Sequence, residues 1–269
     1  MDSSLCTKTT KNFTLNSSRF WHPKNQSIKA DFCGYTQLCS YKNLELAFKN
    51  ARKGKTKKQY VLEFEKELEY NLRKLQSELT FHTYKPEPLQ EFILRDPKTR
   101  KINRSSFRDR IVHHALCNII MPILENTFIY DSYANRRGKG TFKAIERFDY
   151  FKRIVSHNFT RTVFVLEADI RHYFEAVDHD ILISLLKKKI VDGRVLWLIN
   201  RIISHYSIQQ KKGMPLGNLT SQFFANVYLD KLDKFVKHVL KAENYVRYVD
   251  DFVILHESKE QLELWKSQI

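Results

Sequence analysis

The chain contains few of the residues that mark disorder, disulfide bonding or membrane insertion. Its 269 residues include only 7 glycines, 6 prolines and 4 cysteines, and 42% of them are hydrophobic. This composition argues against a disordered or low-complexity chain. No segment approaches 18 consecutive apolar residues, and residues 1–16 lack the apolar core of a signal peptide. We therefore expect a globular protein that stays in the cytoplasm and has no membrane partner.

The cysteines lack the spacing of a metal site. Those at positions 6, 33, 39 and 117 include no C-x-x-C pair, which favours reduced structural thiols over zinc ligands or disulfides. His113, His114 and Cys117 could be ligands on one helix, but the sequence offers no evident second pair of ligands. We expect structural roles for these three residues.

Positive charge and aromatic side chains are abundant instead. The chain has 46 Lys and Arg against 30 Asp and Glu, a formal net charge of +16, with 13 tyrosines and 19 phenylalanines. The basic runs span residues 52–58, 98–110, 136–139 and 187–189. Basic runs are often only solvated faces. Because aromatic rings are interleaved with these charges, a nucleic-acid groove is favoured over a membrane surface.

Hydrophobic periodicity predicts a mixture of helices and strands. Apolar residues recur at the helical period over residues 59–79, from about residue 107, after Thr141 and over residues 219–240. Residues 91–95 and 100–102 are predicted to form a hairpin around a turn at 96–99. Asp178 is a predicted helix N-cap, and Ser258 with Gln261 forms a predicted capping box. Residues 1–30 are predicted to be irregular.

Three acidic residues stand beside apolar strands. Asp250 and Asp251 separate two runs of aromatic and β-branched residues, so a hairpin with both acids at its tip is predicted over residues 245–255. Asp169 lies near the end of a strand predicted over residues 162–170. A carboxylate there is unfavourable unless it is solvated, paired or bound to a cation. Two Mg²⁺ ions would offset the repulsion among three such acids, and polymerases use two metals roughly 3.5–4 Å apart.

The order of these motifs resembles the palm of reverse transcriptases. Asp169 comes first, residues 217–222 (Gly-Asn-Leu-Thr-Ser-Gln) second and residues 248–251 (Tyr-Val-Asp-Asp) third. The third motif is similar to the Tyr-x-Asp-Asp of that family. Upstream, residues 97–100 (Pro-Lys-Thr-Arg) and 107–115 (Phe-Arg-Asp-Arg-Ile-Val-His-His-Ala) resemble the finger motifs of bacterial retroelement enzymes. The resemblance runs from about residue 35 to the end and implies an α+β right-hand polymerase core with palm and fingers.

The resemblance also implies roles for individual residues. Asp169, Asp250 and Asp251 would ligate two Mg²⁺ ions, with the Ile170 carbonyl as a further ligand. Phe174 matches the bulky side chain that excludes a ribose 2′-OH. The full set of residues implied to bind the dNTP is Lys98, Arg100, Phe174, Leu216, Gly217 and Gln222, in which Lys98 and Arg100 would neutralise the triphosphate. The residues implied to bind nucleic acid are Arg110, Arg136, Arg137 and Lys139.

Two positions indicate which subgroup of reverse transcriptases the chain resembles. Most reverse transcriptases carry Gln and Pro where this chain has Leu216 and Gln222, and the replacement of both is similar to the enzymes of diversity-generating retroelements. Residues 132–141 fit the same group. The resemblance then implies error-prone cDNA synthesis, with mistakes gathered at template adenines. Its implied partners are an RNA template, a DNA or RNA primer, dNTPs and a small basic accessory protein.

Alternatives remain open at this point. One alternative is a group II intron or retron-like reverse transcriptase, which is an enzyme of the same class. The other is a protein that keeps the palm fold but only binds nucleic acid, without catalysis. We expect a polar segment over residues 1–34, fingers and the start of the palm over 35–160, and palm over 161–269. The chain ends 18 residues after Asp251, so we expect the helical thumb to be missing.

Overall fold

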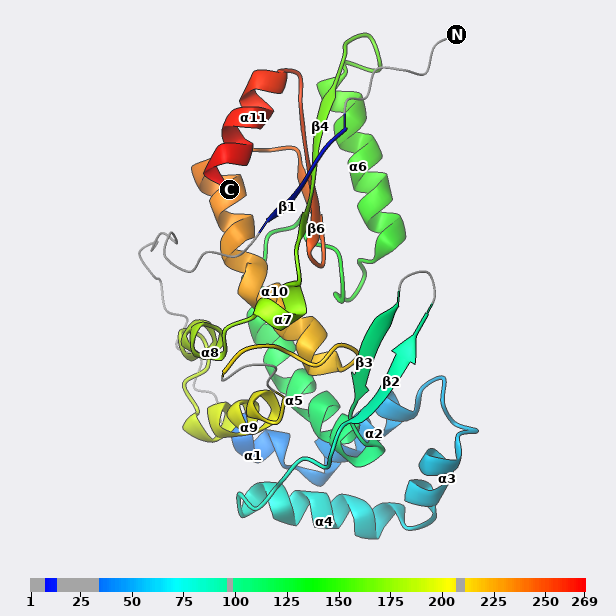
Figure 1. Cartoon of the computed structure of the whole chain (residues 1–269). Helices are drawn as coiled ribbons and strands as arrows, with labels where there is room; N and C mark the ends of the chain where they lie inside the picture. The colour runs from blue at the N-terminus through cyan, green and yellow to red at the C-terminus, as the bar shows by residue number, and fades with distance from the viewer. Residues whose placement is uncertain (1–7, 14–33, 96–98, 207–210) are drawn as a thin grey trace. The chain divides into compact units, whose positions relative to one another are not determined.

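The chain consists of helices with a few short strands between them (Figure 1), and it divides into two units that are each built from separate stretches of the sequence. The computed structural model describes residues 8–13, 34–95, 99–206 and 211–269. Unit 1 comprises residues 1–24, 127–173 and 225–269, and unit 2 comprises residues 25–126 and 174–224. Helix α10 (Leu219–Lys234) contributes residues to both units. Within the described ranges, no helix combines the length and apolar character that a bilayer span needs.

Unit 1 is built on a four-stranded sheet in the order β1-β4-β6-β5. Strand β4 (Phe164–Ile170) runs parallel to β1 (Lys8–Phe13) and antiparallel to β6 (Asp251–His256), which pairs with β5 (Tyr245–Tyr248). The strand predicted before Asp169 and the acidic hairpin are both confirmed. The prediction of an irregular N-terminal segment is wrong for β1, because its backbone pairs with β4, a long-range contact without a local sequence signal.

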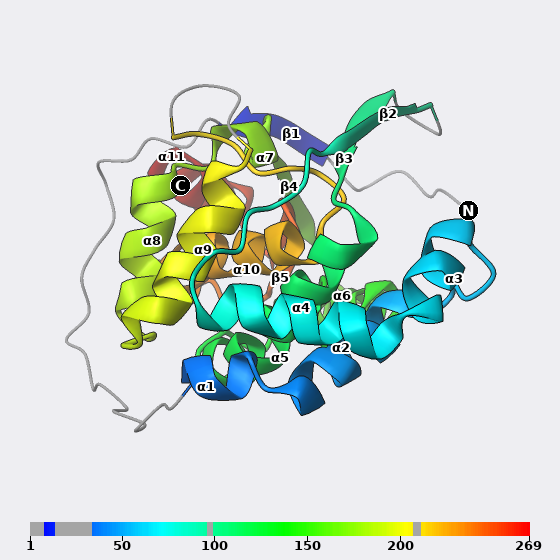
Figure 2. The same ribbon diagram turned by 90° about the horizontal axis from the view of Figure 1, so that it is seen from below.

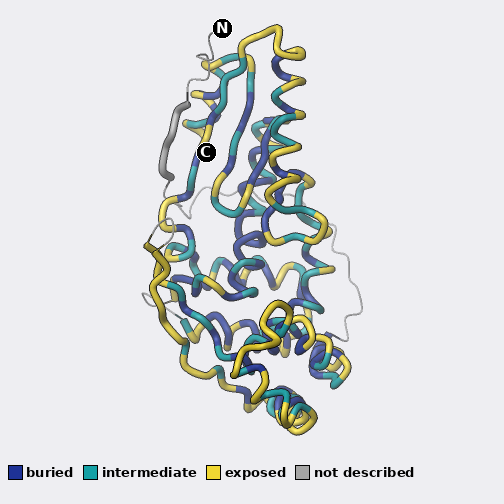
Figure 3. The backbone as a smooth tube through the Cα atoms, turned by 90° about the vertical axis from the view of Figure 1, so that its right-hand side faces the viewer, coloured by how far each residue is buried: buried dark blue, intermediate teal, exposed yellow. Residues whose placement is uncertain are grey.

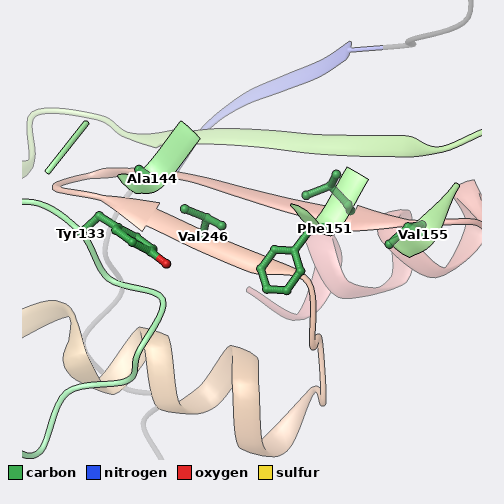
Figure 4. Packing of buried hydrophobic residues seen from close by; sticks show 6 residues of the cluster. Tyr133, Ala144, Phe151, Val155 and Val246 are labelled. Atoms are coloured by element: carbon green, nitrogen blue, oxygen red, sulfur yellow. The ribbon is translucent and has the colours of Figure 1, made fainter. Parts of the chain in front are cut away.

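Helices cover both faces of this sheet. Alternation places Val246 and Val253 on one face, where they pack with Ala144, Phe151 and Val155 of α6 (Thr141–Val155). Figure 4 shows Val246 beside these residues of α6. The opposite face carries Tyr245, Arg247, Phe252 and Ile254, all buried. There Tyr245 and Arg247 contact α10. A π-helical turn, η1 (Phe235–Val239), follows α10 and forms the C-terminal end of the helix predicted over residues 219–240.

Unit 2 is mainly helical. Its helices are α1 (Gly34–Leu38), α2 (Tyr41–Arg52), α3 (Gln59–Lys66), α4 (Leu68–Thr80), α5 (Phe107–Glu125), α8 (His179–Lys187) and α9 (Gly193–Ser204). Buried residues at helical spacing in α2 pack on α5, and α8 lies beside α9 (Figure 2). The short helix α7 (Tyr173–Ala176) begins at the boundary between the units. The burial map in Figure 3 shows buried residues running through the strands and helices of each unit.

The local predictions hold with two corrections. Strands β2 (Gln90–Leu94) and β3 (Arg100–Arg104) form the predicted hairpin, and Asp178 caps α8 with its side chain, accepting from the Ile181 N–H at 3.0 Å. The single helix predicted over residues 59–79 is wrong, because Glu67 leaves helical geometry (φ −122°, ψ 44°) and separates α3 from α4. Ser258 caps α11 (Lys259–Gln268) by accepting from the Gln261 N–H at 3.0 Å, which confirms one half of the predicted capping box. The Ser258 N–H donates to His256 Nδ1 at 2.9 Å in place of the Gln261 side chain.

Candidate active site

Two of the three predicted metal-binding acids lie directly opposite each other in unit 1. Asp169 near the end of β4 is the register partner of Asp251 at the start of β6. Side chains alternate along strands, so Asp169 and Asp251 share a face with Tyr248, the register partner of Asp251 in β5. Asp169 and Asp250 are half-buried, and Asp251 is exposed. Strand pairing thus gathers acids that lie about 80 residues apart in the sequence.

A two-residue turn holds the third acid. Because Tyr248 pairs with Asp251, only Val249 and Asp250 form the connection between β5 and β6. Val249 has a φ of +57°, a left-handed conformation that costs a β-branched residue about 1–3 kcal/mol unless its surroundings hold it. Glycine usually occupies the first position of such turns. The turn therefore depends on contacts that fix its backbone.

A buried arginine supplies that contact. Arg247 Nη1 donates to the Val249 carbonyl at 2.7 Å, while Nε and Nη2 each lie 2.6 Å from a carboxylate oxygen of Asp233 on α10. Arg247 also donates to the Asn226 side chain at 3.1 Å. The two ionic side chains are 1% and 0% exposed. Burial alone would lower the pKa of Arg247, but the Asp233 carboxylate raises it above its ordinary value, so the guanidinium stays charged.

A basic loop lies beside the same hairpin. Thr141, the first residue of α6, donates its hydroxyl to the Tyr248 hydroxyl at 3.0 Å, and the preceding Gly140 N–H donates to the Tyr133 carbonyl at 3.0 Å. The residues from 136 to 141 therefore lie next to the strand that carries the Asp-Asp turn. This places the predicted nucleic-acid-binding residues of unit 1 near its acids.

Two of those basic residues also stabilise the loop. Arg136 Nη1 donates to the Ile129 carbonyl at 2.8 Å and to Ser132. Lys139 Nζ donates to the Tyr130 carbonyl at 2.9 Å and lies 3.3 Å from the centre of the Tyr130 ring. Burial and the nearby Arg136 lower the pKa of Lys139. Arg137 is exposed.

The residues predicted to bind the dNTP lie mainly in unit 2, where the structure brings some of them together. The Leu216 carbonyl accepts a hydrogen bond from the Asn103 N–H of β3 at 3.1 Å. Gly217 has a φ of +110°, and a Cβ there would come within 2.9 Å of the Ile102 side chain. Glycine is therefore required for this loop to lie against β3.

The remaining members of that set are more separate. Arg100 is exposed at the start of β3, and Gln222 is half-buried in the first turn of α10. The half-buried Phe174 accepts through its carbonyl from the Met214 N–H at 2.7 Å, which ties it to the loop that precedes Leu216. Lys98 lies outside the described residues.

The donor chemistry of unit 1 fits Mg²⁺, which prefers carboxylate and carbonyl oxygens. Asp169, Asp250 and Asp251 offer carboxylates from two adjoining strand ends, and Ile170 is the backbone neighbour of Asp169. As the side chains stand, no three His, Cys, Asp or Glu residues in the described ranges are gathered closely enough to hold a metal ion. The case for Mg²⁺ at this site therefore rests on the chemical type of these residues and on their positions at the strand ends.

The histidines of α5 are part of the interior of unit 2. His113 is buried, and burial, with the neighbouring His114, His205 and Arg110, lowers its pKa to about 3. Burial raises the pKa of the Cys117 thiol, which favours its protonated form. These shifts agree with structural roles for His113 and Cys117.

Sequence reasoning missed the residues that support the Asp-Asp turn. Asn226 and Asp233 lie on α10, seven residues apart, and both contact Arg247. A spacing of seven residues repeats on one helix face, and Asn226 interrupts the apolar run of residues 223–229 in this helix. That interruption was the available signal, but only the fold identifies Arg247 as the partner.

The chain is similar in sequence to proteins of one known family. The profile of the family described as "Reverse transcriptase (RNA-dependent DNA polymerase)" matches residues 93–268. The "Group II intron-encoded protein LtrA" of Lactococcus lactis subsp. cremoris is 26% identical over 200 residues, which cover 70% of this chain and 32% of that protein. "Protein YkfC" of Escherichia coli (strain K12) is 27% identical over 177 residues, covering 63% of this chain and 46% of that protein. The chain thus spans less than half the length of these relatives.

The fold was compared with solved structures. A chain of the "Partial Cas6-RT-Cas1--Cas2 complex" aligns over 87% of this chain and 41% of its own length, with a TM-score of 0.51 and 20% sequence identity. At this identity the likeness concerns the fold alone. It supports the predicted α+β palm-and-fingers architecture.

Proposed function

The chain belongs to the reverse transcriptase family, and from that membership we propose that it carries the polymerising core of an RNA-directed DNA polymerase. The observation that carries the proposal is the register pairing of Asp169 with Asp251, with Asp250 in the adjoining two-residue turn. Binding of nucleic acid alone requires no such convergence of carboxylates. Two-metal nucleotidyl transfer does require it.

The three carboxylates, with the Ile170 carbonyl, would hold two Mg²⁺ ions. When bound, these ions would activate the primer 3′ hydroxyl and stabilise the pyrophosphate that leaves. The protein's own part is positional. Arg247 fixes the Val249 carbonyl and thereby the backbone that presents Asp250 and Asp251. Thr141 holds the Tyr248 hydroxyl on the face that carries Asp169 and Asp251.

The dNTP would contact residues of unit 2. Arg100, with Lys98, would neutralise the triphosphate, and Phe174 would exclude a ribose 2′-OH. Leu216, Gly217 and Gln222 would line the position of the incoming nucleotide. The contact of the Leu216 carbonyl with β3 supports this grouping, because it ties the loop that bears Leu216 to the strand that bears Arg100.

The template and primer would contact basic residues in both units. Arg110 on α5 and the loop residues Arg136, Arg137 and Lys139 would bind the phosphate backbone. Arg137 is the exposed member of the loop. Because Arg136 and Lys139 also bond the loop backbone, their replacement would weaken both loop structure and binding.

The finer subgroup is a separate proposal. Leu216 and Gln222 support an error-prone enzyme of the diversity-generating type, because an aliphatic residue at position 216 removes a hydrogen-bonding group beside the nascent pair. A relative named as a group II intron-encoded protein supports the alternative subgroup. The Leu216→Gln variant separates the two, since an unchanged error rate at template adenines would contradict a role for Leu216.

Primer extension on an RNA template with Mg²⁺ and dNTPs tests the proposal. We expect extension by this chain and at least a hundredfold loss in Asp250→Asn/Asp251→Asn. Asp149→Asn on α6, which removes an exposed acid paired with Lys152, is the matched control. Salt-sensitive RNA binding without extension by the unaltered chain would instead support a palm that only binds nucleic acid.

A further inference from the structure

Unit 2 contains a pocket whose lining includes Arg110, which the proposed function already assigns to nucleic acid, together with residues that have no assigned role. Its volume is about 430 Å³, within the range of small-ligand sites. It lies among α3, α4, the beginning of α5 and the hairpin β2–β3. Its lining combines aromatic rings with basic side chains, and the residues that matter most are Tyr60, Phe64, Lys74, Arg104, Phe107 and Arg110.

The charges in this pocket are unbalanced. Lys74, Arg104, Arg108 and Arg110 face Glu87 as the acidic residue of the lining. Arg108 is occupied, since it pairs with Glu78 and with Asp109. In contrast, the Nε atoms of Arg104 and Arg110 are buried and lack a hydrogen-bond partner among the described residues. Guanidinium N–H groups without a protein partner at a pocket favour an anionic ligand.

The aromatic lining is arranged around the same two arginines. The guanidinium carbons of Arg110 and Arg104 lie 4.9 and 5.5 Å from the centre of the Tyr60 ring. Arg110 is also 5.4 Å from the Phe107 ring. A guanidinium held against an aromatic ring is a planar, charged platform, and unpaired bases stack on such groups and on rings. The pocket therefore offers both a phosphate-binding group and a stacking surface.

We propose that this pocket binds one nucleotide unit of a single nucleic-acid strand, with its phosphate on Arg104 and Arg110 and its base against the aromatic lining. A purely apolar ligand would leave both buried Nε–H groups without a partner, and a bare phosphate would leave the rings unused. The site extends the proposed polymerase, whose template is single-stranded ahead of synthesis. The binding itself requires no catalysis.

Binding of a fluorescent single-stranded RNA, measured by anisotropy over a range of salt concentrations, tests the site. We expect Arg104→Gln and Arg110→Gln each to raise Kd about tenfold and to reduce the salt slope by about 0.7. Arg73→Gln is the matched control, because Arg73 also lies over a tyrosine ring, 4.4 Å from the centre of Tyr41, on the same unit but outside the pocket lining. Variants that behave like Arg73→Gln would overturn the proposal.

Two further measurements keep the test decisive. Circular dichroism melting identifies a variant that fails to fold. For such a variant, photocrosslinking of a thiouridine-labelled strand to the unaltered chain takes the place of the binding measurement. Crosslinks on Tyr60 or Phe107 are expected, and crosslinks confined to other elements would contradict the site. A strand with abasic positions should bind more weakly, whereas equal binding would reduce the site to phosphate alone and overturn the nucleotide assignment.

The outcome is separable from that of the proposed function. If the unaltered chain fails to extend a primer, the binding difference between Arg110→Gln and Arg73→Gln still stands or falls by itself. If extension succeeds but the pocket variants bind like the control, the polymerase proposal survives and the pocket proposal fails.

Discussion

The arginine behind the Asp-Asp turn and the arginines of the unit 2 pocket differ in how fully their donors are satisfied. Arg247 is buried and its donors reach a carboxylate, an amide and a backbone carbonyl. Arg104 and Arg110 lie over aromatic rings and leave buried Nε atoms without protein partners in the described residues. The first arrangement stabilises one backbone conformation, and the second leaves hydrogen-bonding capacity for a ligand. Removing Arg247 should therefore lower the free energy of unfolding, whereas removing Arg104 or Arg110 should weaken ligand binding with little change in stability.

The largest effect is expected from Arg247→Met. It leaves the Asp233 carboxylate buried without its main cation, which costs about 3–5 kcal/mol of the free energy of unfolding. Urea denaturation measures this loss. The Arg247→Met/Asp233→Leu double variant should recover much of it, because no unpaired charge remains. A single variant within 1 kcal/mol of the unaltered chain would contradict the assigned role.

One buried group in each unit is expected to make stability depend on pH, with opposite signs in the two units. The pKa of His113 falls to about 3 in the folded protein, so between about pH 3 and 6.5 the unfolded chain binds more protons. The contribution of neutral His113 to the free energy of unfolding is therefore complete above pH 6.5. It is lost as the pH falls from about 6.5 to 3, by at most about 1.4 kcal/mol per pH unit. In unit 1, burial raises the pKa of Asp230 to about 6, which has the opposite sign over about pH 4–6. Between about pH 3 and 6.5 the stability of His113→Asn should rise less with pH than that of the unaltered chain, and identical slopes would contradict this account.

A smaller effect is expected from Gly217→Ala. The positive φ at this position costs an L-residue about 1–2 kcal/mol, and the new Cβ would displace the Ile102 side chain. Thermal unfolding should show a lowered Tm, together with weaker dNTP binding if the loop beside β3 shifts. Gly54→Ala, where an added Cβ meets no atom within 4 Å but φ is also positive, is the control for backbone strain alone. Equal losses of Tm in Gly217→Ala and Gly54→Ala would contradict a separate cost from the close approach of the new Cβ to Ile102.

The smallest stability effect is expected from Arg104→Gln, which should stay within about 0.5 kcal/mol of the unaltered chain. Its hydrogen bond to Gln90 is exposed, so little folding energy depends on it. The same variant should weaken RNA binding. Loss of stability comparable to that of Arg247→Met would erase the distinction between the two arginine sites.

Local patterns in the sequence were sufficient to predict the acidic hairpin, the β2–β3 hairpin and most helices. Asp250 and Asp251 could be placed at a turn because apolar strand residues flank them on both sides. The family resemblance implied that Asp169 lies near Asp250 and Asp251, but the pairing of Asp169 with Asp251 was not predicted, since register between strands about 80 residues apart has no local signal. The division of the chain between fingers and palm at residue 160 remains a prediction.

Contacts between distant segments account for what the sequence did not reveal. Strand β1 exists through its pairing with β4, and the role of Arg247 emerges only when α10 lies beneath β5. The pocket of unit 2 joins residues from α3, α4, β3 and α5. Periodicity describes one element at a time and therefore could not predict these sites.

The most direct test of the central claim is single-nucleotide incorporation opposite an RNA template, followed as a function of Mg²⁺ concentration for the unaltered chain and for Asp251→Asn. The account predicts Mg²⁺-dependent incorporation of a dNTP, reduced at least a hundredfold in Asp251→Asn, while Asp149→Asn retains the unaltered rate. Incorporation that is unaffected by Asp251→Asn would contradict the assignment of this site.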